Sequence, residues 1–303
     1  MKRFSLLAVI MVFTLLAFLL PKSDGEEGYV GQQACMECHE ESYRSYQKNY
    51  HSTKGDPRTP AAKQGCESCH GPGGAHSREQ DPEKILALGP KSALPSDKKS
   101  AACLECHTKG KVALWQGSEH EGRGVSCSDC HSIHKGVPKS RSASDEIGVC
   151  ARCHINIRAD LTRQSHHPIR EGKIKCSDCH NAHGTASDKL VDAQFVNQKC
   201  FKCHADLRGP FLWDHPPVIE DCLSCHTPHG SPRTPLLKAK MPYLCQRCHS
   251  NVSHPSQLQA RTTGDAGQSV YRVLNNRGFY RSCLNCHVSI HGSNHPSGKS
   301  LLR

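Results

Sequence analysis

The sequence has too few apolar and aromatic side chains to build an ordinary globular core. Of its 303 residues, 36% are apolar and 5% are aromatic. The mean hydropathy is −0.59 even though the chain begins with an apolar run. A polypeptide of this composition cannot bury enough apolar surface to offset the entropy lost on folding. It also lacks the alternation of apolar and polar residues that predicts β-strands. Something other than side chains must supply the missing apolar mass.

No cysteine lies outside one repeated pattern, because all 20 Cys belong to ten Cys-x-x-Cys-His units. Two thiols at this spacing can form thioethers with the two vinyl groups of one porphyrin, and the following histidine then becomes the proximal ligand of the iron. The pattern predicts ten covalently bound c-type haems. The thioether cysteines are Cys35, Cys38, Cys66, Cys69, Cys103, Cys106, Cys127, Cys130, Cys150, Cys153, Cys176, Cys179, Cys200, Cys203, Cys222, Cys225, Cys245, Cys248, Cys283 and Cys286. The proximal ligands are His39, His70, His107, His131, His154, His180, His204, His226, His249 and His287.

Other chemistries of paired cysteines do not explain a histidine after every second cysteine. A structural zinc site takes four ligands, drawn from two Cys-x-x-Cys halves, and does not require that histidine. A disulfide framework does not require it either. Thioredoxin-like motifs occur singly and in a βαβ pattern, which is absent here. Haem attachment is the interpretation that accounts for all ten units.

Ten of the twelve remaining histidines recur at regular places. When the units are taken in consecutive pairs, one histidine lies between the two members and another shortly after the second. This arrangement predicts five two-haem repeats, at residues 35–76, 103–134, 150–183, 200–229 and 245–295. The distal-ligand candidates are His51, His76, His120, His134, His167, His183, His215, His229, His254 and His291. The sequence leaves open which candidate serves which haem, and whether His166 or His295 is a ligand.

Methionine is too scarce to be the usual second ligand. Outside the N-terminal segment, only Met36 and Met241 are present, so His/Met ligation, which raises haem potentials, is not expected as the rule. Ligation by two histidines saturates an iron and leaves no position for a substrate. We therefore predict an electron carrier. The alternative, a multihaem reductase of nitrite or hydroxylamine, would need one haem with an open position.

Residues 1–25 have the pattern of a secretory signal peptide. Lys2 and Arg3 precede an apolar run at residues 4–20, and a polar stretch follows. An uncleaved membrane anchor is the alternative, because the run approaches the length needed to span a bilayer. Either way, we expect residues 26–303 to form a decahaem region in the periplasm.

The excess of basic residues does not predict a nucleic-acid partner. The formal charge is +11, but ten haems would add about 20 propionates, which are ionised at neutral pH as carboxylates are. Many of the 39 Lys and Arg are expected to neutralise these groups. No basic run with interleaved aromatic residues suggests a nucleic-acid groove.

The predicted fold class is a multihaem cytochrome c with little regular secondary structure, in which short helices and coil wrap a near-linear array of ten haems. A helix is expected at residues 40–49, and irregular connectors at 77–101 and 255–282. Trp115 and Trp213 are expected to pack on porphyrin faces. Contacts should join neighbouring repeats only, as in other repeat proteins.

Four segments resemble the MtrA/DmsE-type decahaem cytochromes. They are Cys66-Glu-Ser-Cys-His-Gly-Pro-Gly-Gly-Ala-His76, Cys176-Ser-Asp-Cys-His-Asn-Ala-His183-Gly, Arg208-Gly-Pro-Phe-Leu-Trp213-Asp-His215, and the tail from Ser282 to Lys299. The family has one histidine where this chain has two, and His167 matches it, so His166 is a departure.

This resemblance implies a periplasmic cytochrome associated with the outer membrane. Such a protein inserts into an outer-membrane β-barrel porin and carries electrons across that membrane. An extracellular multihaem cytochrome or a mineral lies at the far end, and a periplasmic or inner-membrane donor or acceptor at the near end. The direction of electron flow is left open, as is the alternative of a free periplasmic shuttle.

Overall fold

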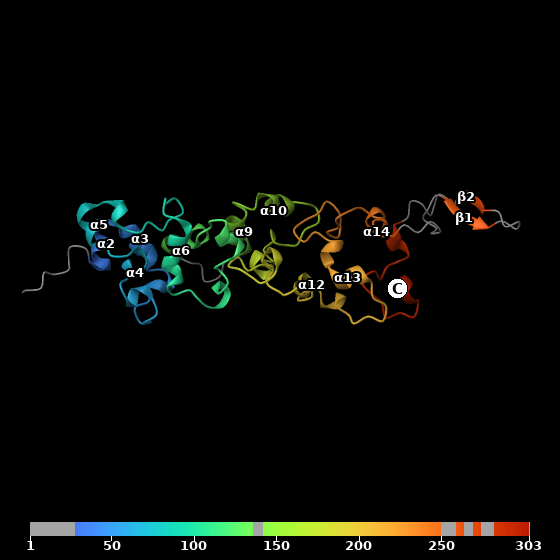
Figure 1. The fold of residues 1–303 in the computed structure, drawn as a ribbon, viewed down its shortest axis with the longest axis horizontal. Coiled ribbons are helices and arrows are strands. Elements are labelled where there is room, and N and C mark those ends of the chain that lie inside the picture. Colours follow the sequence, from blue (N-terminus) through green and yellow to red (C-terminus); the bar gives the residue numbers. More distant parts are fainter. Residues whose placement is uncertain (1–27, 136–141, 250–258, 264–268, 274–281, 303) are drawn as a thin grey trace, which may run out of the picture. The chain divides into compact units, whose positions relative to one another are not determined.

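A computed structural model describes residues 28–135, 142–249, 259–263, 269–273 and 282–302. The predicted signal peptide lies outside these residues. The described chain consists of short helices joined by turns and coil (Figure 1). It divides into two compact units, one made of Met1–Gly110 with His120–Ser140 and the other of Lys111–Glu119 with Arg141–Arg303.

The helices are short throughout the described part of the chain. The α-helices are α2 (Gln32–Cys38), α3 (Glu40–Tyr46), α4 (Glu67–His70), α5 (Gly74–Glu79), α6 (Ser96–Leu104), α7 (Glu119–Gly122), α8 (Cys127–Cys130), α9 (Ala143–Cys150), α10 (Ile155–Asp160), α11 (Cys176–Cys179), α12 (Val196–Cys200), α13 (Pro216–Glu220) and α14 (Tyr243–Gln246). Single 3-10 turns are η1 (Tyr50–Ser52), η2 (Pro60–Ala62), η3 (Pro82–Lys84), η4 (Gly110–Val112), η5 (Ile133–Lys135), η6 (Asp188–Leu190), η7 (Ala205–Leu207), η8 (Cys222–Ser224), η9 (Cys283–Asn285) and η10 (Gly298–Ser300). Within the described ranges, no helix is long and apolar enough to cross a membrane.

Four of the cysteine motifs begin a helical turn with a local cap. In the two Cys-Ser-Asp-Cys motifs, Asp129 and Asp178 accept hydrogen bonds from the backbone N–H groups of Ser126 and Lys175, at 2.7 and 2.8 Å. In two others, the residue before the motif caps the turn, because Asp221 accepts from the N–H of Leu223 and the hydroxyl of Ser282 accepts from the N–H of Leu284. Such caps satisfy the N–H groups that have no partner at the start of a helix. These four motifs thus begin their helical turns at the cysteines themselves.

The predicted helix at residues 40–49 is shorter than expected, because α3 ends at Tyr46. The connector predicted at 77–101 is also not wholly irregular, since its last residues begin α6. The connector predicted at 255–282 contains two short strands. There β1 (Gln259–Thr263) and β2 (Ser269–Val273) pair in an antiparallel hairpin, with Gln259 opposite Val273. Most of the remaining connector lies outside the described residues.

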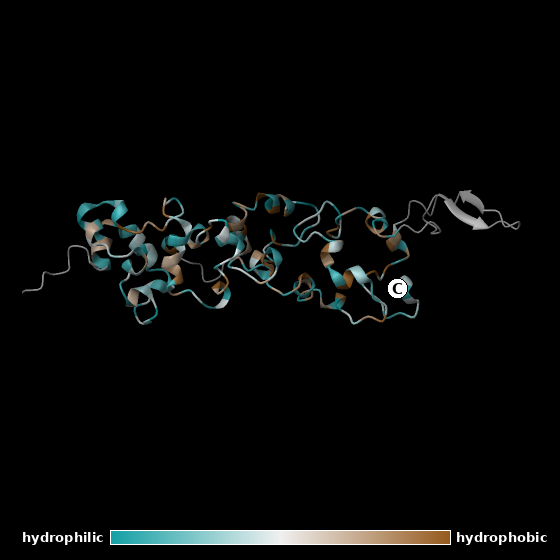
Figure 2. Ribbon diagram, in the orientation of Figure 1, coloured by the Kyte–Doolittle hydropathy of each residue, from teal (hydrophilic) through white to brown (hydrophobic). Residues whose placement is uncertain are grey.

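The chain builds almost no apolar core of its own. Figure 2 shows apolar segments scattered among hydrophilic ones along the ribbon. Among the described residues, the buried apolar side chains are Tyr46, Trp115, Ala143, Ala151, Leu161, Ile169, Leu237, Leu244 and Leu301. A domain of this length normally buries a contiguous cluster of large side chains. The expectation of short helices and coil is confirmed. The expectation that haem supplies the core stays a prediction.

Helices that carry the cysteines pack against one another within each unit. In the first unit, α6 contacts both α8 and α4. In the second, α9 contacts α11, and α12 contacts η8. These contacts bring together motifs that follow one another in the sequence.

Candidate haem-binding sites

The first cysteines of paired motifs face each other. Hydrogen bonds join the thiols of Cys35 and Cys66, Cys103 and Cys127, Cys150 and Cys176, Cys200 and Cys222, and Cys245 and Cys283. Burial, reinforced by the facing thiol, raises the pKa of Cys35, Cys200 and Cys245 to about 11. The five contacts fall within the five repeats taken from the sequence.

Within each unit, the second cysteines make the connections between repeats. Cys69 lies close enough to Cys106 for their charges to interact, and the same is true of Cys179 with Cys203 and of Cys225 with Cys248. Along each unit, contacts between two first cysteines therefore alternate with contacts between two second cysteines. Within each of the two units, every junction between consecutive motifs has such a contact.

Seven proximal histidines each face one distal candidate. The centroids of the two rings lie between 6.0 and 6.3 Å apart in every case. The pairs are His39 with His76, His70 with His134, His107 with His51, His180 with His229, His204 with His167, His226 with His291, and His249 with His215.

This separation fits an iron held between two imidazoles. An imidazole nitrogen lies about 2 Å from a metal ion, and the ring centroid about 1 Å further back, so opposed ligands place their centroids about 6 Å apart. Rings stacked directly on each other would be closer. The observed spacing leaves room for one ion and the thickness of a porphyrin between the rings.

In six of the seven pairs, the two histidines come from neighbouring repeats. His51 follows the first motif but faces His107 of the third, while His134 follows the fourth motif and faces His70 of the second. Repeats three and four exchange histidines in the same way, as do repeats four and five. The exception is His39 with His76, both in the first repeat. The sequence could not give this assignment, although the possibility that a nearby histidine serves a neighbouring haem was open.

Backbone carbonyl groups orient many of these rings through Nδ1. A hydrogen bond from Nδ1–H to a carbonyl fixes the tautomer in which Nε2 is free to bind a metal. The pairs are His70 with Leu86 at 2.7 Å, His76 with Asp81 at 2.8 Å, His134 with Ser42 at 3.3 Å, His167 with Pro228 at 2.6 Å, His180 with Lys189 at 2.9 Å, His215 with Ile290 at 3.1 Å, His226 with Pro235 at 2.9 Å, and His287 with Ser300 at 2.6 Å. No sequence pattern marks these acceptors.

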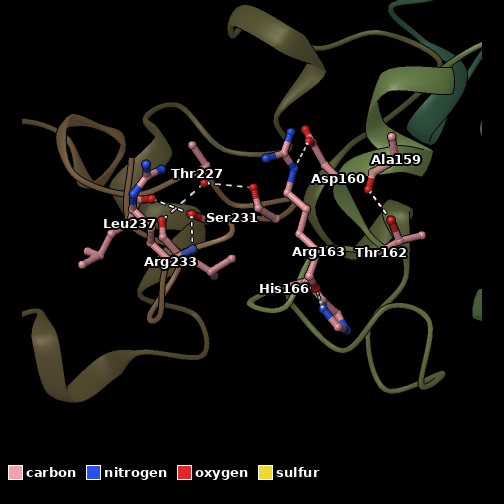
Figure 3. Close-up of polar contacts among 11 residues, drawn as sticks. Ala159, Asp160, Thr162, Arg163, His166, Thr227, Ser231, Arg233 and Leu237 are labelled. Atoms are coloured by element: carbon pink, nitrogen blue, oxygen red, sulfur yellow. Dashed lines mark hydrogen bonds and ion pairs between the residues drawn. The ribbon is translucent and has the colours of Figure 1, made fainter. Parts of the chain in front are cut away.

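His166 and His295 are not among the ten distal candidates, and their ring nitrogens make other hydrogen bonds. Nδ1 of His166 lies 2.6 Å from the carbonyl of Arg163 (Figure 3), and its Nε2 lies 3.0 Å from the carboxylate of Glu171. Neither nitrogen is left for a metal. His295 accepts a hydrogen bond at Nδ1 from the N–H of Ser297, which places the proton on Nε2. The structure therefore brings His167, not His166, opposite a proximal ring.

Three candidates are not brought into these pairs. The ring of His183 lies 6.4 Å from that of Trp115, and its Nδ1 is 3.2 Å from Oδ1 of Asn181. His254 lies outside the described residues. With His120, they remain candidates on the evidence of the sequence alone.

A glycine follows three of the distal candidates because another segment passes against it. A Cβ atom at Gly230 would lie 1.9 Å from the carbonyl oxygen of Asp160, and one at Gly184 would lie 2.1 Å from that of Leu114. At Gly292 it would overlap the ring of Phe211, at 2.2 Å. The His-Gly pairs of the sequence are thus sites of close backbone approach.

The two tryptophans sit in the second unit. Trp115 is 5% exposed. Nε1 of Trp213 is buried without a hydrogen-bond partner among the described residues. An indole donor in this state fits a site where a group outside the polypeptide supplies the acceptor. Packing on porphyrin faces remains a prediction for both.

Comparison with known proteins finds similarity to multihaem c-type cytochromes. The family described as "Doubled CXXCH motif" matches residues 166–209 and 215–254. The family described as "Cytochrome c-type protein NrfB-like" matches residues 66–153. The multiheme cytochrome MtrA of Shewanella baltica is 39% identical over 283 residues, which cover 93% of this chain and 84% of the relative.

Two further likenesses are weaker. The high-molecular-weight cytochrome c of Nitratidesulfovibrio vulgaris is 26% identical over 156 residues, which cover 50% of this chain and 25% of that protein. An undecaheme cytochrome from the S-layer of Carboxydothermus ferrireducens matches with 19% identity and a TM-score of 0.15, over 79% of this chain and 32% of that one.

Proposed function

The chain belongs to the MtrA family of multihaem c-type cytochromes, and from this premise we propose that it conducts electrons across the outer membrane along ten haems. Membership in this family means that the chain binds haem c covalently and transfers electrons. The count of ten haems, the ligands of each iron and the membrane setting are the steps that we add.

We assign one haem to each Cys-x-x-Cys-His unit, ten in all, with two histidines on every iron. The observation that supports this most strongly is the set of seven opposed imidazole pairs at 6.0–6.3 Å. The carbonyl groups on Nδ1 hold Nε2 toward the metal and make the imidazole a better donor. Each bound haem supplies a one-electron couple between ferric and ferrous iron.

The assignment favours an electron carrier over an enzyme. An iron with two protein ligands has no position for nitrite or another small substrate, so its chemistry is limited to gaining and losing an electron. Within each unit, the exchange of distal histidines joins the haem sites of neighbouring repeats. The alternating cysteine contacts bring consecutive attachment points together along each unit. Such a chain of sites suits transfer from one end to the other.

The membrane setting is proposed from the family. We expect the protein in the periplasm, held in an outer-membrane β-barrel porin, with an extracellular multihaem cytochrome or a mineral as the outer partner. A periplasmic or inner-membrane redox protein would exchange electrons at the inner side.

Fractionation of cells that make the full chain tests the membrane proposal. After separation of periplasm and outer membrane, the haem-stained protein should remain with the outer membrane. It should then co-purify in mild detergent with a β-barrel protein in about equal amounts. A control periplasmic enzyme should stay in the soluble fraction. If the cytochrome is instead soluble, monodisperse and free of any barrel, it is a free shuttle and the conduit proposal is wrong.

A further inference from the structure

The seven histidine pairs differ in how many of their rings donate Nδ1–H to a backbone carbonyl. Five pairs have one such hydrogen bond, and His70 with His134 has two. The pair of His51 and His107 has none among the described residues. This pair serves the third motif, which begins at Cys103.

The backbone of His51 is held firmly by hydrogen bonds, although the Nδ1 of its ring has no acceptor. Its backbone N–H donates to Oδ1 of Asn49 at 2.9 Å, and its carbonyl accepts from the hydroxyl of Tyr46 at 2.6 Å. Tyr46 and Asn49 are themselves buried. Yet Nδ1 of His51 is buried without a hydrogen-bond partner, so solvent does not replace the carbonyl. A buried polar atom without a partner costs free energy and calls for an explanation.

The ring planes of this pair also differ from most of the others. His51 and His107 cross at 65°, whereas four pairs lie within 13–23° of parallel. His167 with His204 crosses at 56°, and His70 with His134 at 37°. Crossed imidazoles give ferric haem an electron paramagnetic resonance (EPR) signal with a large maximal g value, and near-parallel ones give a rhombic signal. The type of EPR signal therefore distinguishes haems with crossed histidine rings from haems with near-parallel ones.

Both features act on the reduction potential in the same direction. A carbonyl on Nδ1–H increases the basicity of Nε2, and a more basic ligand stabilises ferric over ferrous iron. Without a carbonyl acceptor on Nδ1–H, the ferrous state is therefore more stable relative to the ferric state. Crossed ligand planes favour the ferrous state further. Two crossed imidazoles donate less effectively than two parallel ones into the same d orbital of ferric iron.

We propose that the haem of the third motif, between His107 and His51, has the most positive reduction potential of the seven haems with an assigned histidine pair. An electron that reaches this group of haems is then most stable on the third. The proposal rests on the ligand assignment above. Its contrast is the adjacent second motif, where His70 and His134 both donate to carbonyls. Cys69 and Cys106 bring these two motifs together. One electron passing between them oxidises ferrous iron at the second motif and reduces ferric iron at the third, with no proton or bond transferred.

A redox titration of the full holoprotein followed by EPR tests the proposal without any variant. As the potential is lowered, a signal of the large-g type should disappear before the rhombic signals of the four near-parallel pairs. If every large-g signal outlasts the rhombic signals, the proposal is overturned.

Two matched variants assign the component. His51→Met and His134→Met each replace a distal ligand with one that raises the potential. In His51→Met, the component missing from the wild-type set should be one of the four most positive, because three of the ten haems lie outside the ranking of the seven pairs. In His134→Met, it should come from the negative end. If His51→Met removes a component of the lower half, the inference fails while the ligation stands. If His51→Met leaves every component and the low-spin spectrum unchanged, His51 is not a ligand, and the assignment beneath the inference fails as well.

Discussion

Replacement of His167 by methionine should raise the potential of one haem, the one attached at the seventh motif. His167 lies between the fifth and sixth motifs in sequence, yet its ring faces His204 at 6.3 Å. His/Met ligation stabilises ferrous iron. The shift should be on the order of 0.1–0.2 V, within the roughly 0.8 V over which axial ligands set haem potentials. Potentiometric titration followed by absorbance should show one component moving and the others in place.

The neighbouring histidine is the matched control. His166→Met should leave every potential unchanged, because His166 binds Arg163 and Glu171 with its two nitrogens. The loss of its ion pair with the exposed Glu171 should have little effect on stability, because water screens such a pair. If His166→Met shifts a haem potential and His167→Met does not, the assignment of the pair is reversed.

The chain without haem should not fold. Production of residues 26–303 without the N-terminal segment, in a cytoplasm that does not attach haem, should yield a polypeptide with a coil-like far-ultraviolet circular dichroism spectrum. The described helices are too short to be stable alone, and few apolar side chains are buried. The situation is that of metal domains whose binding energy is also their folding energy.

The holoprotein in the same buffer is the control, and it should unfold cooperatively on heating. A cooperative thermal transition in the haem-free chain, with helical signal comparable to that of the holoprotein, would contradict a cofactor-dependent core. Partial collapse without a transition would not, because hydrophobic clusters persist in unfolded chains.

The attachment sites were predictable because their chemistry is local. Two thiols and an imidazole must stand within five residues to serve one porphyrin, so the motif is complete in the sequence. The distal candidates stay a prediction from their regular positions, and the structure places seven of the ten opposite a proximal ring. Their partners were not predictable, because a pair such as His51 and His107 depends on how the repeats pack. No periodicity reports which ring of one repeat reaches into the next.

The secondary structure shows the same division. Short helices follow from local caps such as Asp129 on the turn at Cys127, which the sequence shows directly. The β1–β2 hairpin was missed because its strands, Gln259–Thr263 and Ser269–Val273, carry no apolar alternation. Register there is set by backbone pairing. The carbonyl groups that orient the histidines were equally invisible, since every residue has one and only the fold selects which faces a ring.

The central claim is that ten irons each lie between two histidines and are closed to substrate. Spin quantitation of the EPR spectrum of the fully oxidised holoprotein tests it most directly, since two histidine ligands make ferric haem low-spin. The account predicts about ten low-spin haems per chain, one for each Cys-x-x-Cys-His unit, and no high-spin signal. A high-spin signal equal to one iron per chain would show an open position and contradict the account.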